Sequence, residues 1–164
     1  MGMARDRPSS AGALAPTEHR STAAIAGHPL HPAVVPIPIG LLSAAAVSDV
    51  AYLITGEGFF ARMSRWLIGG GIFGGLMAAS LGLIDFSTIR VARGPMGIAH
   101  AGGNAAILGM SAVSLVLRQQ SESRVPLAAL GLSAAAAAML AVTGWLGGEL
   151  VFRKGIGVVP PTER

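Results

Sequence analysis

The chain has 164 residues, of which 52% are hydrophobic and 12% are charged, and it contains no cysteine. An ordinary soluble domain has about 25% charged residues. This chain therefore has too few charges to cover a soluble surface, and it is predicted to be an integral membrane protein. The absence of cysteine excludes disulfides, iron–sulfur clusters on Cys ligands and Cys-based zinc sites.

The net charge of +4 could indicate a nucleic-acid-binding protein. The basic residues, however, lie almost entirely between the apolar stretches of the chain. That distribution is typical of membrane topology signals and not of a surface that reads a nucleic-acid groove. No nucleic-acid partner is expected.

The first 26 residues are rich in Ser, Ala, Pro and charge. A secretory signal needs a continuous apolar region of about 7–15 residues, and Ala11–Pro16 is too short for one. Residues 1–26 are therefore predicted to be a disordered cytoplasmic tail, with His19 as an incidental solvated residue. Residues 27–157 are predicted to form one transmembrane domain, and residues 158–164 a C-terminal tail.

Four apolar stretches are long enough for membrane helices, which need about 20 largely apolar residues. Their connections are short, so neighbouring helices must run antiparallel. The predicted fold class is all-α, an integral membrane four-helix up-down bundle. Small residues such as Gly70 and Gly74 allow close packing, and no long internal repeat is evident between the two helix pairs. The predicted spans are 33–54, 66–86, 99–117 and 126–148.

Two further expectations concern the first span and the orientation. Pro32, Pro36 and Pro38 fall in the first turns of that span, so the regular helix either begins near Pro38 or begins at Pro32 and is kinked. Lys and Arg are more numerous on the side of the bundle that carries both termini. The positive-inside rule then places both termini in the cytoplasm.

The antiparallel arrangement predicts that one end of the bundle collects most of the polar residues. His100 and Asn104 are four residues apart and share a helix face, and Trp145 and Glu149 have the same relation. Ionisable groups in or beside a membrane span are costly unless they are paired or wetted, which suggests a function. The residues predicted to meet at this end are His28, His31, Asp85, Arg90, His100, Asn104, Trp145 and Glu149.

Two interpretations of this end involve no bound cofactor. In the first, Asp85 and Arg90 form an interfacial ion pair, the histidines reach toward water and Trp145 belongs to the aromatic belt of the membrane. In the second, Asp85, Arg90, His100 and Glu149 form a proton or ion path.

The third interpretation is a ligand site. Three histidines that converge from two helix ends could bind haem iron, for which His is a usual axial ligand, with Asn104 as a hydrogen-bond partner. They could instead hold zinc or another divalent metal with a carboxylate completing the shell. The predicted cofactor-binding residues are His28, His31, His100 and Asn104, and the predicted metal ligands are His28, His31, Asp85, His100 and Glu149.

Asp49 lies near the opposite end of the first span, about 7 Å from it at 1.5 Å per residue. It can reach the interface, pair with Arg62, Arg65 or Arg118, or take part in transport, and a structural ion pair is favoured over transport.

Several motifs together resemble a family of predicted bacterial membrane proteins of unknown function. The resemblance covers roughly residues 25–157. It rests on Gly27-His28-Pro29-Leu30-His31-Pro32 followed by Pro36–Leu41 and Asp49, on Asp85, Arg90 and His100-x3-Asn104, and on Gly144–Val151.

The resemblance implies four membrane helices in a bacterial inner membrane. Some relatives are associated with Rieske-type iron–sulfur proteins, which implies redox chemistry and a redox protein partner. The general plan is similar to that of small haem-carrying four-helix cytochromes. Those cytochromes place paired histidines within the bilayer, whereas His28 and His31 here precede the first span.

The function predicted from these observations is a noncatalytic, redox-associated membrane subunit that binds haem b or a divalent metal. The alternatives are a structural or assembly protein without a ligand and a small proton-coupled carrier. The sequence shows no nucleophile–base pair or phosphate-binding loop, so an enzyme is not favoured. The lipid bilayer and a second copy of the chain are the other expected partners.

Overall fold

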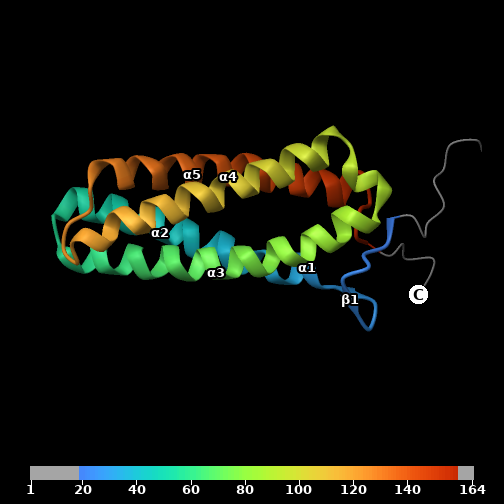
Figure 1. Ribbon diagram of the computed structural model, residues 1–164, viewed down its shortest axis with the longest axis horizontal. Coiled ribbons are helices and arrows are strands. Elements are labelled where there is room, and N and C mark those ends of the chain that lie inside the picture. Colours follow the sequence, from blue (N-terminus) through green and yellow to red (C-terminus); the bar gives the residue numbers. More distant parts are fainter. Residues whose placement is uncertain (1–18, 159–164) are drawn as a thin grey trace, which may run out of the picture.

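Four long helices form the molecule in a computed structural model, which describes residues 19–158 (Figure 1). They run alternately up and down, and the two described chain ends lie at the same end of the bundle. Each is long and apolar enough to cross a membrane. The predicted all-α four-helix membrane bundle is therefore confirmed. The long helices are α2 Pro36–Thr55, α3 Gly58–Thr88, α4 Pro95–Leu117 and α5 Leu127–Gly148.

Short elements surround these helices at the two ends of the bundle. A two-residue hairpin, β1 Ala24–Ile25 with β2 His28–Pro29, comes just before the short helix α1, Leu30–Val34. With these short helices included, the membrane-spanning candidates are Leu30–Thr55, Gly58–Thr88, Pro95–Gln120 and Leu127–Arg153. The remaining short elements are the 3-10 helices η2 Arg90–Arg93 and η3 Arg118–Gln120 and the π-helix η4 Glu149–Arg153.

The second membrane helix begins earlier than the predicted span 66–86. Gly56 ends α2 in the left-handed conformation, with φ of 70°, which is a common way to stop a helix. Only Gly56 and Glu57 lie between the end of α2 at Thr55 and the start of α3 at Gly58. Residues 58–65, expected in a loop, are helical because their arginines, like most of their other residues, are compatible with a helix and can direct their charge outward.

The start of the first span combines the two alternatives for its prolines. Helical hydrogen bonding crosses the junction between α1 and α2, because the Val35 N–H donates to the His31 oxygen at 3.1 Å and the Ile39 N–H to the Val35 oxygen at 3.3 Å. Pro36 has no N–H to contribute. The chain is therefore helical from Leu30, with an interruption at Val35.

Residues 19–26 of the predicted N-terminal tail belong to the described part of the chain. Residues 1–18 lie outside the described part of the chain, as do residues 159–164 of the C-terminal tail. His19, expected to be incidental, donates from its ring Nδ1 to the Lys154 oxygen at 2.9 Å. Its own backbone oxygen accepts the Gly157 N–H at 2.7 Å. These two bonds hold the described beginning of the chain against its described end.

The distribution of side chains between interior and surface is that of a membrane protein. The buried positions are largely Ala, Gly and Ser, whereas large apolar side chains such as Trp66, Phe73 and Leu127 are exposed on the outside. This surface would be unfavourable in water but suits lipid. The packing uses close backbone approach: an added Cβ at Gly71 would meet Leu42 at 2.6 Å, and one at Gly75 would meet Leu108 at the same distance.

The two helix pairs, α2–α3 and α4–α5, share a pattern of buried positions that the sequence analysis missed. Four buried residues of α2 each have a buried counterpart 69 residues later, in α4 or directly after it. Four buried residues of α3 likewise have buried counterparts 65 residues later, in α5. The first set pairs Pro38 with Ile107, Leu42 with Ser111, Ala45 with Ser114 and Asp49 with Arg118, and the second pairs Ser64 with Ala129, Ile68 with Ser133, Gly71 with Ala136 and Ala78 with Thr143.

The contacts between the two pairs are reciprocal, since α2 packs on α5 and α3 packs on α4. The bundle is thus two similar helical hairpins related by an approximate two-fold axis along its length. The repeat escapes a comparison of residue types because equivalent positions carry different chemistry, with Asp49 opposite Arg118 and Leu42 opposite Ser111.

Candidate functional site

The described structure gives equivalent surroundings to two of the histidines predicted to meet, His31 and His100. His31 is the second residue of α1, and His100 lies in the second turn of α4, at the equivalent position. The His31 Nδ1 donates to the backbone oxygen of Ala78 at 2.8 Å, and the His100 Nδ1 donates to that of Thr143 at 2.9 Å. A carbonyl oxygen can only accept, so each Nδ1 carries the hydrogen.

Each imidazole ring occupies space left by a glycine on the neighbouring helix, one turn after the residue whose backbone oxygen accepts the Nδ1 hydrogen bond. A Cβ added at Gly82 would approach the His31 ring to 2.9 Å, and one at Gly147 would approach the His100 ring to 3.0 Å. Gly82 and Gly147 are again equivalent positions of the two hairpins. Both rings are therefore held by the same arrangement, a backbone oxygen that accepts the hydrogen bond and a glycine four residues later that leaves room for the ring.

The helix α1 and the beginning of α4, which carry the two rings, lie at the same end of the bundle (Figure 1). With Nδ1 protonated in a neutral ring, the lone pair available to a ligand is on Nε2. The Asn104 amide nitrogen donates to the His100 backbone oxygen at 2.8 Å and lies 3.3 Å from the His100 Nε2. Asn104 is thus beside the ring, as its spacing from His100 predicts.

Other members of the predicted polar end have different partners. His28 is exposed in the hairpin, and its Nδ1 donates to the Ala26 oxygen at 3.1 Å. Glu149 pairs with Arg153 at 3.3 Å. Trp145 is 70% exposed and faces outward.

Asp85 does not form the predicted ion pair with Arg90. Its carboxylate accepts hydrogen bonds from the Ser21 hydroxyl, at 2.9 and 2.8 Å, and from the backbone N–H groups of Thr22 at 2.9 Å and Ala23 at 3.1 Å. Arg90 is exposed at the beginning of η2. The carboxylate is therefore bound by the N-terminal segment, which was predicted from the sequence to be a disordered tail.

The larger metal site does not assemble in the described part of the chain. Among residues 19–158, no group of three or more His, Cys, Asp or Glu side chains is arranged to hold a metal ion. The five predicted ligands are separated because three of them bind elsewhere, and this leaves the pair His31 and His100. The three that bind elsewhere are His28, Asp85 and Glu149.

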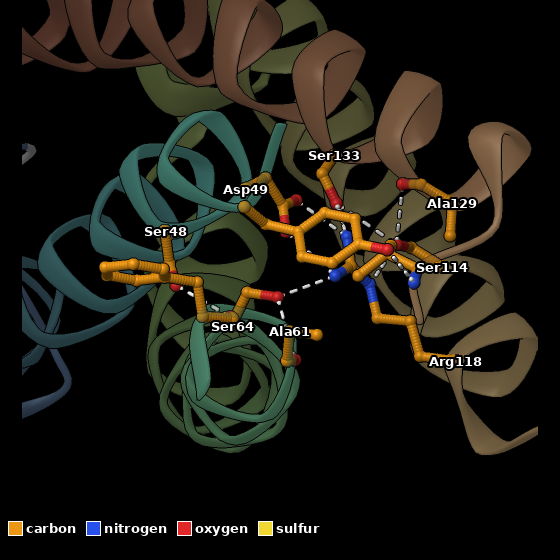
Figure 2. A network of polar contacts seen from close by, with 11 residues as sticks. Ser48, Asp49, Ala61, Ser64, Ser114, Arg118, Ala129 and Ser133 are labelled. Atoms are coloured by element: carbon orange, nitrogen blue, oxygen red, sulfur yellow. Dashed lines mark hydrogen bonds and ion pairs between the residues drawn. The ribbon is translucent and has the colours of Figure 1, made fainter. Parts of the chain in front are cut away.

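The opposite end of the bundle holds a buried network around Asp49 and Arg118 (Figure 2). The Arg118 guanidinium donates two hydrogen bonds to the Asp49 carboxylate, at 2.8 and 2.6 Å. Its remaining donors reach Ser64 at 2.6 Å, Ser114 at 3.2 Å and Ser133 at 2.8 Å. All five guanidinium hydrogens are therefore used. Each of the four long helices supplies one accepting residue, and Asp49 accepts with both of its carboxylate oxygens.

Arg118 is one of the three partners predicted for Asp49 from the sequence, whereas the three serines were not predicted. Arg118 is 1% exposed and Asp49 5% exposed, so the pair is isolated from solvent and lipid. Ser114 could have been noticed, because it precedes Arg118 by one helical turn. Ser64 and Ser133 give no comparable local signal, since only the tertiary packing brings their helices to the guanidinium.

Each histidine stands about five helical turns, or roughly 27 Å, before the charged residue of its own hairpin. That separation is close to the thickness of a bilayer hydrocarbon core. Between the two polar layers lies an apolar cluster of Leu42, Ile107 and Ala136. A neighbouring cavity, lined by residues such as Ala45 and Ser111, has a volume of only about 10 Å³.

These features define a polytopic membrane protein, a duplicated helical hairpin with a histidine pair at one end and a buried ion pair at the other. The chain belongs to the predicted membrane protein family DUF2231, whose model matches residues 27–160. Comparison with curated proteins and with solved structures gives no match.

Proposed function

We propose that this protein is a membrane subunit that binds haem iron through the Nε2 atoms of His31 and His100. The observation that carries the proposal is the pair of Nδ1 hydrogen bonds to backbone oxygens. Histidines that bind metals almost always donate their second ring nitrogen in this way, which fixes the tautomer and the orientation of the ring. Two such rings in equivalent positions would suit a group that takes two similar nitrogen ligands from the chain.

The number of ligands favours haem over a bare divalent ion. Structural zinc takes four ligands from the protein, and catalytic zinc takes three, whereas the structure offers two imidazoles and no larger group among residues 19–158. A porphyrin supplies four nitrogens itself, so haem iron would need only one or two further ligands from the chain. Bound haem would supply one-electron redox chemistry, which fits a redox protein partner at the membrane.

Residues around the two histidines would then serve the site without binding iron. The Ala78 and Thr143 oxygens hold the rings, and Gly82 and Gly147 make room for them. Asn104 stands beside the His100 ring and would set its orientation.

The test is the visible spectrum of the protein purified in detergent, recorded with its metal content, after expression with ample haem. We expect a Soret band in the wild type, lost or strongly reduced in His31→Ala and in His100→Ala. His28→Ala is the matched control, because that histidine is exposed and bound only to its own hairpin, and it should keep the band.

Other outcomes decide against the proposal. A colourless wild-type protein that also fails to bind added haem would refute it, as would a Soret band that survives both substitutions. A stoichiometric divalent metal without a Soret band, lost on substitution of either histidine, would replace haem with a metal ion.

For the orientation, we propose that the protein lies in a bacterial inner membrane with the histidine end and both termini on the cytoplasmic side. The excess of Lys and Arg at that end of the bundle supports this orientation. The chain has no native cysteine, so a single cysteine reports its own side. Ser87→Cys should react with a membrane-impermeant maleimide only after the cells are opened. Ser123→Cys, at the other end, should react in intact cells, and the reverse pattern would invert the orientation.

A further inference from the structure

The N-terminal segment Ser21–Ala23 is fastened to the end of α3 by one carboxylate. Asp85 accepts the Ser21 hydroxyl and the N–H groups of Thr22 and Ala23, and the Thr22 hydroxyl lies 3.4 Å from the same carboxylate. The Thr22 hydroxyl also contacts that of Thr88, at the end of α3, at 2.6 Å. Several hydrogen bonds to one ionised group make this a strong local anchor.

The anchored segment continues without slack into the helix that carries His31. The Ala23 oxygen accepts the Leu30 N–H at 2.8 Å, which closes a loop around the paired strands β1 and β2. The turn between those strands is tight, with Ala26 at φ of 50° and Gly27 at 79°. His31 follows Leu30 directly, so a carboxylate on α3 fixes the start of α1.

His100 is held in a different way. It lies inside a regular helix that begins at Pro95, so the preceding turn of α4 fixes its backbone. His31, by contrast, is the second residue of a five-residue helix, and helix ends fray unless they are tied down. In the second hairpin the position that corresponds to Asp85, three residues beyond the glycine, is occupied by Leu150, which cannot anchor a strand of backbone N–H groups.

We propose that Asp85 is a positioning residue for His31: it anchors the segment Ser21–Leu30 and thereby holds the His31 ring against the Ala78 oxygen. The consequence for haem rests on the function proposed above, whereas the position of the ring does not. Asp85 acts on only one of the two histidines, so the other provides an internal control within the same molecule.

The test compares Asp85→Asn with wild type by NMR of the detergent-solubilised protein, with the histidine rings labelled with nitrogen-15. In the wild type, both His31 and His100 should show the tautomer protonated at Nδ1. In Asp85→Asn the His31 signals should shift or broaden while those of His100 stay in place. Amide exchange at Thr22, Ala23 and Leu30 should accelerate in the same variant, by at least tenfold.

Glu149→Gln is the matched control, because Glu149 is a carboxylate at the same end that pairs with Arg153 and does not touch the anchored segment. It should leave both histidines unchanged. His31 signals in Asp85→Asn that match the wild type would overturn the proposal. Equal changes at His31 and His100 would also overturn it, since they would report a general loss of structure.

Haem titration then separates this inference from the proposed function. If the wild type binds haem, Asp85→Asn should weaken the affinity about tenfold or more, as loss of a group that orients a ligand usually does, and unchanged affinity would contradict the positioning role. If the wild type binds no haem, the proposed function fails, and the NMR and exchange results alone decide the role of Asp85.

Discussion

The two polar ends of this bundle are built at equivalent positions of the same two hairpins, but they differ in how completely their polar atoms are used. At the Asp49–Arg118 end, every guanidinium hydrogen has an acceptor within the bundle. At the histidine end, Nδ1 of each ring donates to a backbone oxygen, so that the Nε2 lone pair is the one left for a ligand. Among the described residues the His31 Nε2 has no hydrogen-bond partner, and the His100 Nε2 has only the Asn104 amide, at 3.3 Å, which a ligand would displace.

The difference separates two reasons for placing polar groups inside a membrane protein. A saturated network has no capacity left for a ligand and holds helices in register. A ring that is oriented through one atom and available through the other is suited to binding. The comparison therefore predicts that the Asp49–Arg118 end matters most for stability and the histidine end most for ligand binding.

The largest effect is expected from breaking the buried ion pair. Arg118→Leu leaves the Asp49 carboxylate buried without a counter-charge, and removal of one partner of such a pair typically costs about 3–5 kcal/mol. The free energy of unfolding should fall by that amount in denaturant titrations in mild detergent. A loss under 1 kcal/mol would mean that Asp49 finds water or another cation, and the structural assignment of this end would fail.

An exchange of the two charges uses the approximate two-fold axis as a control. Asp49 and Arg118 occupy equivalent positions, so Asp49→Arg combined with Arg118→Asp should re-form the pair from the opposite hairpins. We expect the double variant to regain at least half of the stability that the two single variants lose together. Additive losses would show that the two positions are not interchangeable.

Most of the fold was accessible from the sequence because lipid imposes a simple rule. Spanning segments must be long, apolar and hydrogen-bonded within themselves, and four stretches met that rule. The boundaries were less accessible: α3 begins at Gly58 because helix continues beyond the apolar core, where hydropathy no longer marks it. The duplication was hidden because most equivalent buried positions differ in residue type, as Asp49 and Arg118 do, and only isolated pairs such as His31 and His100 are identical.

The candidate site was accessible only in part. His31 and His100 could be named from the antiparallel topology, which brings the starts of the first and third spans together. That Asp85 lies outside the candidate ligand site could not be predicted. Its partners include the backbone N–H groups of Thr22 and Ala23, and backbone donors have no signature in a sequence. His28 lies in the hairpin and is exposed, whereas His31, three residues later, lies in α1 and is bound to α3.

A smaller effect should distinguish hydrogen bonds to the charged network from ordinary ones. Ser64 accepts from Arg118 at 2.6 Å, whereas Ser48 donates to the neutral Phe60 oxygen at 2.8 Å, and both serines are buried. Ser64→Ala should cost about 1.5–3 kcal/mol and Ser48→Ala about 0.5–1.5 kcal/mol in the free energy of unfolding. Equal costs would show that the charge of Arg118 adds nothing to this hydrogen bond.

The smallest effects on stability are expected at the histidine end. In protein free of ligand, His31→Ala or His100→Ala removes one hydrogen bond to a backbone oxygen, worth about 0.5–1.5 kcal/mol. His28→Ala should stay within about 0.5 kcal/mol of wild type, as exposed substitutions usually do.

Haem at about 100 times its Kd should then stabilise the wild type and His28→Ala by about 2.7 kcal/mol. The same addition should do nothing for the His31 and His100 variants. Stabilisation of all four proteins alike would place the binding elsewhere, and a loss of several kcal/mol in the ligand-free His31 variant would make this end structural as well.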